Sequence, residues 1–184
     1  MNVEVFLPSE QIREGIVIPK LTHGSDIVTI VSGEEDIANC DALITRNRAL
    51  SLGVRTADCS PICFSDGRMI GIAHIGWRGL CLGLIEKMLT HFDTATLDVY
   101  VGPFLHTFEI QKDFCYEQIT QKFGGRFIEQ KDEELIFNFK DAISSLLPLQ
   151  TQYDTRDTAT DLSLPSYRRD KTKERLTTVV SFSV

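Results

Sequence analysis

The chain has 184 residues, of which 42% are hydrophobic and 24% charged, the composition of a globular protein that can bury one core. Its net charge of −7 provides no basic field to attract nucleic acid, so we expect no nucleic-acid partner. No apolar run approaches the ~18–20 residues that cross a bilayer, and the first residues do not resemble a signal peptide. Five cysteines at irregular spacing are not a disulfide framework. These features favour a cytoplasmic protein without a membrane partner.

Strands are expected where β-branched residues cluster between Gly, Asp, Asn and Pro. In chain order the expected strands are Val3–Phe6, Asp26–Val31, Ala42–Thr45, Ala49–Val54, Ser60–Phe64, Met69–Ile75, Leu97–Val101 and Thr177–Phe182.

Helices are expected over three segments. Gly79–Phe92 repeats apolar residues every four positions. Lys112–Lys122 is followed by Gly124, a suitable left-handed stop, and Asp141–Leu147 is ended by a proline. Mixed strands with helices on the outside predict an α+β (or mixed α/β) sandwich that forms a single domain over residues 1–184.

A hairpin is expected within the stretch TADCSPICFSDGRMIGIAHIGWRG, because Asp66-Gly67 is a strong signal for a two-residue turn. A turn centred there places Cys59 directly opposite His74, with Cβ atoms ~4.5–5.5 Å apart. A sulfur and an imidazole nitrogen at that separation can reach one metal ion, or each other. Pro61 resists this register, because it has no N–H for a ladder hydrogen bond.

The strand ends in Gly76-Trp77-Arg78-Gly79, where the expected helix begins. Free backbone N–H groups and the Arg78 guanidinium suit an anion at this corner, and phosphate first of all. A cation–π stack of the neighbouring tryptophan and arginine is the structural alternative.

A catalytic zinc usually has three protein ligands and one open position, so Cys59 and His74 need a third. The candidates are His23, His91 and His106. His91 lies near the end of the expected helix and is interpreted as structural. His23 precedes a strand and is followed by a glycine that lets the backbone bend close to a site.

The motifs LTHG, DALIT, TADCSPICFSD, IAHIGWRG, VGP and PSYRRDKTKERL occur here in the order seen in the YfiH-like proteins, and the chain resembles that family from about Leu21 onward. The family was long labelled laccase-domain or multicopper polyphenol oxidase. The resemblance implies a purine nucleoside phosphorylase with some adenosine deaminase and methylthioadenosine phosphorylase activity. It also implies one zinc ion bound by His23, Cys59 and His74.

The chain departs from the family pattern at several positions. The resemblance implies a longer N-terminal segment, which this chain does not show, and a glutamine where Leu21 stands. Ile75 replaces a smaller alanine, and Ala159-Thr160 replaces Cys-Thr. The changes leave the metal triad intact and fall on the substrate pocket.

Purine nucleoside and phosphate are the expected partners, and the protein is expected to be a monomer or a small homo-oligomer. Arg78 is the candidate for the phosphate, and Arg168 is a second. Asp58 is interpreted as a proton carrier or as a partner that holds a ligand histidine, with the capping of a turn as the structural alternative.

Three other functions are alternatives to the phosphorylase. Copper oxidase chemistry is not expected, because multicopper sites need more than the four histidines of this chain. A thiol hydrolase or deamidase would use Cys59 as its nucleophile. A non-catalytic zinc-binding remnant would hold metal without acting on nucleosides.

Overall fold

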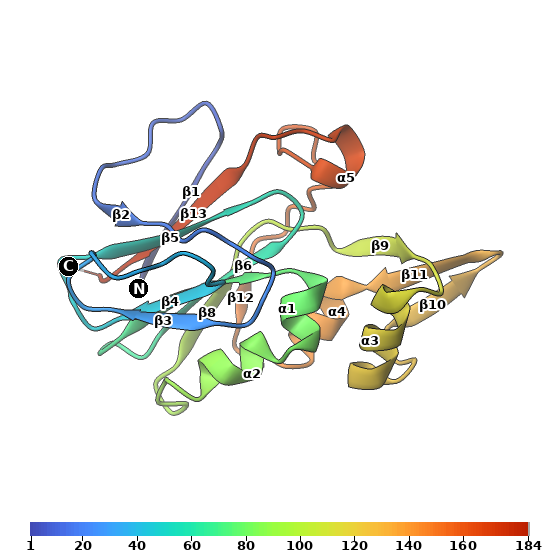
Figure 1. Cartoon of the computed structure of the whole chain (residues 1–184), viewed down its shortest axis with the longest axis horizontal. Helices are drawn as coiled ribbons and strands as arrows, with labels where there is room; N and C mark the ends of the chain where they lie inside the picture. Colours follow the sequence, from blue (N-terminus) through green and yellow to red (C-terminus); the bar gives the residue numbers. More distant parts are fainter. Residues whose placement is uncertain (184) are drawn as a thin grey trace.

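The computed structural model describes residues 1–183, and its backbone is built around a six-stranded sheet (Figure 1). The sheet runs in the order β12 (Gln152–Tyr153), β8 (Asp98–Val101), β6 (Ser60–Ser65), β7 (Ile70–Ile75), β4 (Ala42–Thr45) and β3 (Ile27–Ile30). Every residue of β4, β6 and β7 is buried, which explains why these segments are apolar without alternation.

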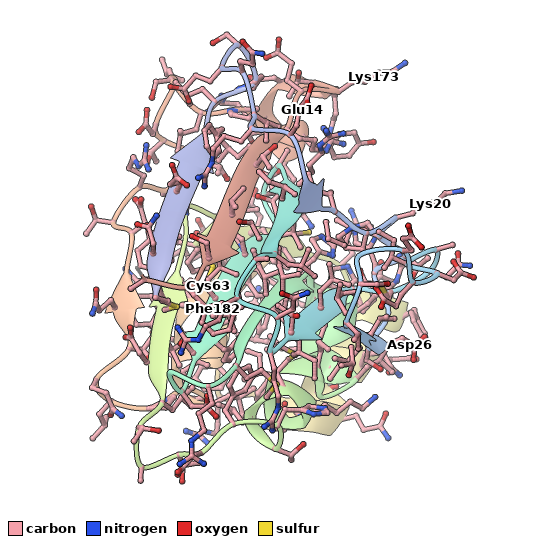
Figure 2. All side chains as sticks on the ribbon, turned by 90° about the vertical axis from the view of Figure 1, so that its left-hand side faces the viewer. Glu14, Lys20, Asp26, Cys63, Lys173 and Phe182 are labelled. Atoms are coloured by element: carbon pink, nitrogen blue, oxygen red, sulfur yellow. The ribbon has the colours of Figure 1, made fainter. Side chains whose placement is uncertain are left out.

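A second, four-stranded sheet packs against one face of the large sheet. Its order is β1 (Asn2–Phe6), β13 (Leu176–Ser181), β5 (Ser51–Thr56) and β2 (Ile16–Val17). Leu52 and Val54 of β5 share a cluster of buried side chains with Cys63 and Ile72 of the large sheet. Phe182 packs against this cluster, and Figure 2 shows Phe182 close to Cys63. The two sheets therefore form a sandwich with an apolar interior.

Helices cover the opposite face of the large sheet. They are α1 (Trp77–Cys81), α2 (Leu84–Leu89) and α4 (Phe139–Ser144). Side chains at the alternate positions of the strands, such as Ile62 and Phe64, pack against these helices in a larger core cluster. The sheet is therefore buried on both faces.

A three-stranded antiparallel sheet extends to one side of the sandwich (Figure 1). It comprises β9 (Thr107–Ile110), β11 (Glu134–Asn138) and β10 (Ile128–Lys131), and α3 (Phe114–Phe123) packs beside it. We call this extension, made of β9, β10, β11 and α3, the arm. The short α5 (Tyr167–Asp170) lies beside β9, since the guanidinium of Arg168 lies over the ring of Phe108.

The α+β sandwich is confirmed, and each of the eight expected strands has an observed counterpart. The other two expected helices are present with shifted bounds. α3 ends before Gly124, which has a φ of 64°, and α4 covers Phe139–Ser144 rather than Asp141–Leu147, with Asn138 as its N-cap. Among residues 1–183, no helix is long and apolar enough to span a membrane.

The expectation of one helix over Gly79–Phe92 was wrong. The structure has two short helices, and Gly83 separates them with a left-handed φ of 78°. The apolar residues of both halves, including Leu80, Leu84 and Met88, are still buried against the sheet. The apolar periodicity therefore predicted correctly which residues are buried, but not that Gly83 divides the helix in two.

The expected register of the β6–β7 hairpin was wrong by two residues. Ser65 pairs with Ile70, so the turn comprises the four residues 66–69, and Pro61 rather than Cys59 lies opposite His74. The Asp66 carboxylate accepts hydrogen bonds from the backbone N–H groups of Arg68 (2.9 Å) and Met69 (2.8 Å), which stabilises the longer turn.

Pro61 is accommodated in this register without loss of a hydrogen bond to β7. The backbone N–H of His74 donates to the carbonyl oxygen of Asp41 (2.7 Å), on the far side of β7 from Pro61. The backbone groups of His74 thus face β4 and not β6. The missing N–H of Pro61 therefore costs no hydrogen bond to His74.

Candidate metal centre

Three side chains from separate parts of the chain meet at one end of the sandwich. His23 lies in the loop before β3, Cys59 directly precedes β6, and His74 is near the end of β7. One potential ligand atom from each of the three lies within 4.8 Å of the other two. The imidazole rings of His23 and His74 are arranged edge to face, with centroids 4.8 Å apart. We call these three residues the triad.

The triad forms although the predicted hairpin register was wrong. Side chains alternate between the two faces of a strand, so a shift of two residues leaves Cys59 and His74 on the same face. They are diagonal neighbours across the end of the hairpin rather than a directly opposed pair. Cys59 also follows Asp58, whose left-handed φ of 87° turns the chain between β5 and β6.

Asp41 forms hydrogen bonds with two members of the triad. Its side chain is fully buried, and Oδ1 lies 2.8 Å from Nδ1 of His74. The same carboxylate accepts hydrogen bonds from the backbone N–H groups of His23 (2.9 Å) and Gly24 (2.7 Å) and from the hydroxyl of Thr22 (2.8 Å). Asp41 therefore fixes both the ring of His74 and the loop that carries His23.

The hydrogen bonds also explain how a buried carboxylate stays ionised. Burial disfavours the charged form of Asp41, but the bonds from His74, Gly24 and Thr22 hold its pKa well below the usual range. Because Nδ1 of His74 faces Asp41, its Nε2 is the atom left for a ligand role.

The glycines of the strand–helix corner let the backbone pass close to the triad. A Cβ atom on Gly76 would lie 3.2 Å from Sγ of Cys59 and 3.3 Å from Cδ2 of His23. A Cβ atom on Gly79 would lie 2.9 Å from the carbonyl oxygen of Gly24. A larger residue would collide with Cys59 and His23 at position 76, and with the loop that carries His23 at position 79.

The Asp58 side chain forms no hydrogen bond with a histidine of the triad. Its buried carboxylate accepts hydrogen bonds from the hydroxyls of Thr158 (2.8 Å) and Ser166 (2.7 Å) and from the backbone N–H of Arg168 (2.7 Å). The role of holding a ligand histidine therefore falls to Asp41, and Asp58 ties the C-terminal segment to the turn before Cys59.

The thiol of Cys59 is held in a form suited to metal binding. Burial alone would raise the pKa of this thiol, but hydrogen bonds with His23 and His74 outweigh it and lower the pKa to about 6. For His74, burial opposes protonation, while Asp41 and Cys59 favour it and raise the pKa to about 9. A thiolate is the metal-ligating form of cysteine.

The donor set of the triad fits zinc. Two imidazoles and one thiolate are three protein ligands of the types that zinc prefers, which leaves room for a fourth. Carboxylate partners such as Asp41 commonly orient a zinc-ligating histidine.

The other two histidines of the chain lie apart from the triad. His91 lines an apolar cavity with Ile30 and Met69, and Nδ1 of His106 lies 3.6 Å from Oδ2 of Asp157. The chain has four histidines, and only His23 and His74 belong to the triad. They do not provide the ligands of a multicopper cluster.

The triad opens into a cleft of about 690 Å³ that is lined by the end of β5 and the turn after it, the start of α1, and residues on and just after α5. Arg78 and Arg168, the two predicted phosphate ligands, both line it. The guanidinium of Arg78 lies over the ring of Trp77 (4.9 Å to the centroid), and that of Arg168 lies over Phe108 (4.2 Å). Stacking therefore positions both cations at the cleft on the side of the arm.

Comparison with known proteins agrees with the resemblance seen in the motifs. A purine nucleoside phosphorylase of Aquifex aeolicus is 30% identical, with 98% of this chain and 92% of that one covered. The purine nucleoside phosphorylase YfiH of Escherichia coli is 27% identical, over 86% of this chain and 70% of that one. These coverages show that the relatives differ in length.

Among solved structures, that of the hypothetical protein YfiH of Bacillus licheniformis superposes with a TM-score of 0.80. It covers 92% of this chain and 74% of that one at 22% sequence identity, and so supports the fold. A family model described as multi-copper polyphenol oxidoreductase laccase matches residues 2–183. The proteins named YfiH are similar to this chain over most of its length. The chain thus belongs to this laccase-like family.

Proposed function

We propose that this protein is a zinc-dependent purine nucleoside phosphorylase that cleaves adenosine- or inosine-type nucleosides with phosphate. One observation carries the proposal: the His23–Cys59–His74 triad opens into the same cleft as Arg78 and Arg168. A metal site beside two arginines suits a reaction between an anion and a neutral heterocyclic substrate. The names of the similar proteins from Aquifex aeolicus and Escherichia coli support this choice.

The reaction requires that phosphate be held in line with the sugar. An oxygen of phosphate bonds to C1′, the bond from C1′ to the purine nitrogen breaks, and the purine leaves with the electron pair and takes up a proton. Arg78 and Arg168 provide planar guanidinium forks that bind the phosphate oxygens. Their stacking on Trp77 and Phe108 limits the side-chain motion that binding would otherwise have to restrict.

Zinc held by His23, Cys59 and His74 would supply a Lewis acid that polarises the bound substrate. Asp41 keeps His74 in the tautomer and orientation that this role requires.

We assign Asp58 to positioning rather than to proton transfer. Its carboxylate already accepts three hydrogen bonds, one of them from the backbone of Arg168, so it places Arg168 relative to the turn that carries Cys59. Adenosine deamination and the phosphorolysis of methylthioadenosine would use the same cleft as secondary activities.

A thiol hydrolase or deamidase is the second candidate, and the environment of Cys59 favours it. Hydrogen bonds from two histidines lower the pKa of the Cys59 thiol to about 6, as a nucleophile would require. Bound zinc separates the two functions, because a metal-ligated thiolate is protected from alkylation. A non-catalytic zinc-binding protein would hold metal and release no base.

The direct test is to incubate the zinc-loaded protein with inosine in the presence and absence of phosphate and to measure hypoxanthine. We expect release that depends on phosphate and saturates with it, and a higher KM for phosphate in Arg78→Gln. Base release at the same rate without phosphate would indicate a hydrolase. Zinc binding without any base release would support the non-catalytic alternative. Parallel incubation with adenosine reports deamination as inosine.

A further inference from the structure

The cleft beside the triad carries more positive charge than one phosphate ion requires. The basic residues that line it are Arg55, Arg78, Arg168, Lys171 and Arg175. Asp58 is the one carboxylate among the described lining residues, and its oxygens are engaged in hydrogen bonds to Thr158, Ser166 and Arg168. This concentration is notable in a chain with a net charge of −7.

Among the described residues, these five cations lack acidic partners although they line one cavity, whereas some basic residues elsewhere are paired. Arg156 pairs with Asp154 (2.7 Å) and Arg169 with Asp170 (2.6 Å), and Lys122 pairs with Glu86. Within residues 1–183, none of the five cleft cations forms a salt bridge with a carboxylate. Unneutralised like charges around one cavity repel one another, and a bound anion removes that cost.

The cations form two groups according to the elements that lie beside them. Arg78 and Arg168 belong to the arm side, since Arg168 lies over Phe108 of β9 and Trp77, which carries Arg78, packs against Phe114 of α3 (6.2 Å between centroids). This is the group already assigned to inorganic phosphate.

The second group consists of Arg55 on β5, Arg175 directly before β13, and Lys171 at the end of α5. Arg55 of β5 pairs with Thr177 of β13, so Arg175, two residues earlier, projects from the same face as a diagonal neighbour of Arg55. The Nη1 atom of Arg175 donates to the backbone carbonyl oxygens of Thr172 (3.0 Å) and Glu174 (2.7 Å). These hydrogen bonds anchor the guanidinium at the cleft. Lys171 lines the same cavity from the end of α5.

We propose that Arg55 and Arg175, with Lys171, form a second anion subsite, and that the substrate brings its own phosphate to it. The substrate class is then a purine nucleoside 5′-monophosphate, and inorganic phosphate occupies the arm-side group. This inference rests on the proposed function and extends it. An oxygen of inorganic phosphate bonds to C1′, the purine leaves with a proton, and the 5′-phosphate stays on the sugar. The products are a free purine and ribose 1,5-bisphosphate.

The test compares inosine 5′-monophosphate with inosine, in turnover and in binding by titration calorimetry, on the zinc-loaded protein. We expect kcat/KM to be at least about tenfold higher for the monophosphate, and this advantage to shrink as salt is raised. Arg55→Gln and Arg175→Gln should each lower kcat/KM for the monophosphate roughly ten- to hundredfold more than for inosine, the loss typical of a charged hydrogen bond. Arg55→Lys should restore part of the preference.

Arg126→Gln is the matched control, because Arg126 is an exposed arginine that stacks on Phe127 and does not line the cleft. It should leave the ratio of the two substrates unchanged. If inosine is cleaved and the monophosphate is no better, or Arg55→Gln and Arg175→Gln affect both substrates equally, the second subsite is refuted while the phosphorylase stands. If neither compound is cleaved but the monophosphate binds more tightly and Arg55→Gln abolishes the difference, the subsite stands and the phosphorylase fails. Equal binding of both compounds by every variant would overturn the inference.

Discussion

Oδ1 of Asp41 lies 2.8 Å from Nδ1 of His74, and this fully buried carboxylate also accepts hydrogen bonds from the backbone of the loop that carries His23. One side chain thus links two members of the triad that lie far apart in the sequence. The geometry of the proposed zinc site consequently depends on a residue that would not itself touch the metal.

Asp41→Asn should weaken zinc binding about ten- to hundredfold, the range usual for the loss of a carboxylate partner of a metal-ligating histidine. The asparagine keeps the size of the side chain but removes the negative charge that favours the required tautomer. Titration of the zinc-loaded protein with a competing chelator measures the change. Asp36→Asn is the control, because Asp36 is exposed and accepts one hydrogen bond from the backbone of Ala38. Equal zinc affinity in Asp41→Asn and wild type would refute the role of Asp41.

Gly76→Ala should lower zinc affinity at least about tenfold without unfolding the protein, since even small displacements of a ligand reduce affinity. The φ of Gly76 is −91°, which alanine adopts freely, so the effect comes from the new Cβ atom 3.2 Å from Sγ of Cys59. Gly125→Ala is the matched control, because nothing lies within 4 Å of a Cβ atom there. Chelator titration and thermal denaturation separate metal affinity from stability. A Gly76→Ala protein that binds zinc as tightly as Gly125→Ala would contradict the close approach.

Cys59 should be the first cysteine to be alkylated in the metal-free protein at pH 7. Hydrogen bonds from His23 and His74 lower the pKa of its thiol to about 6 against the effect of burial, so the thiolate predominates above that pH. Burial raises the pKa of Cys40 to about 11, so its thiol stays protonated, and burial also raises the pKa of Cys63.

Peptide mapping after brief exposure to iodoacetamide measures the order of alkylation. Zinc should protect Cys59 and leave the rates of the other cysteines unchanged. Rapid alkylation of Cys59 in the presence of saturating zinc would argue for the thiol hydrolase instead.

Asp58→Asn should leave zinc content at the wild-type value and lower the free energy of unfolding by about 1–3 kcal/mol, because it weakens buried hydrogen bonds to a charged acceptor. Since Asp58 accepts from the backbone N–H of Arg168, the change should raise KM for phosphate more than it lowers kcat. Steady-state kinetics at varied phosphate, together with urea denaturation, measures both effects. A large fall in kcat with unchanged KM would instead indicate that Asp58 transfers a proton.

Much of the fold could be predicted because the strands of the large sheet are short, apolar and rich in β-branched residues. The arm was harder to predict, because β10 has the polar sequence IEQK and is nearly all exposed. The turn between β10 and β11 comprises Asp132 and Glu133, without glycine, whereas Asp66-Gly67 forms a longer turn in which the Asp66 side chain binds the backbone. Turn length depends on such side-chain bonds, which a dipeptide signal does not reveal.

The members of the triad could be anticipated, but their support could not. Cys59 and His74 share a face of one hairpin, so sequence spacing was informative even with a register wrong by two residues. Asp41 was missed because its bonds to His74 and to the His23 loop join residues that are distant in the chain. A lone carboxylate directly before the apolar strand Ala42–Thr45 was the available signal. Arg55 on β5 and Arg175 before β13 become neighbours only through the pairing of these strands, so the sequence alone does not bring them together.

The zinc content of untagged protein is the most decisive test of the proposed site. It should be measured for wild type, for Cys59→Ser and His74→Ala, and for His91→Ala as a control outside the triad. We expect about one tightly bound zinc ion per chain in wild type and His91→Ala, and strong loss of zinc in the two triad variants. Phosphate-dependent release of hypoxanthine from inosine should follow the zinc content across the series. Full base release by Cys59→Ser or His74→Ala protein that contains no zinc would contradict a zinc-dependent phosphorylase.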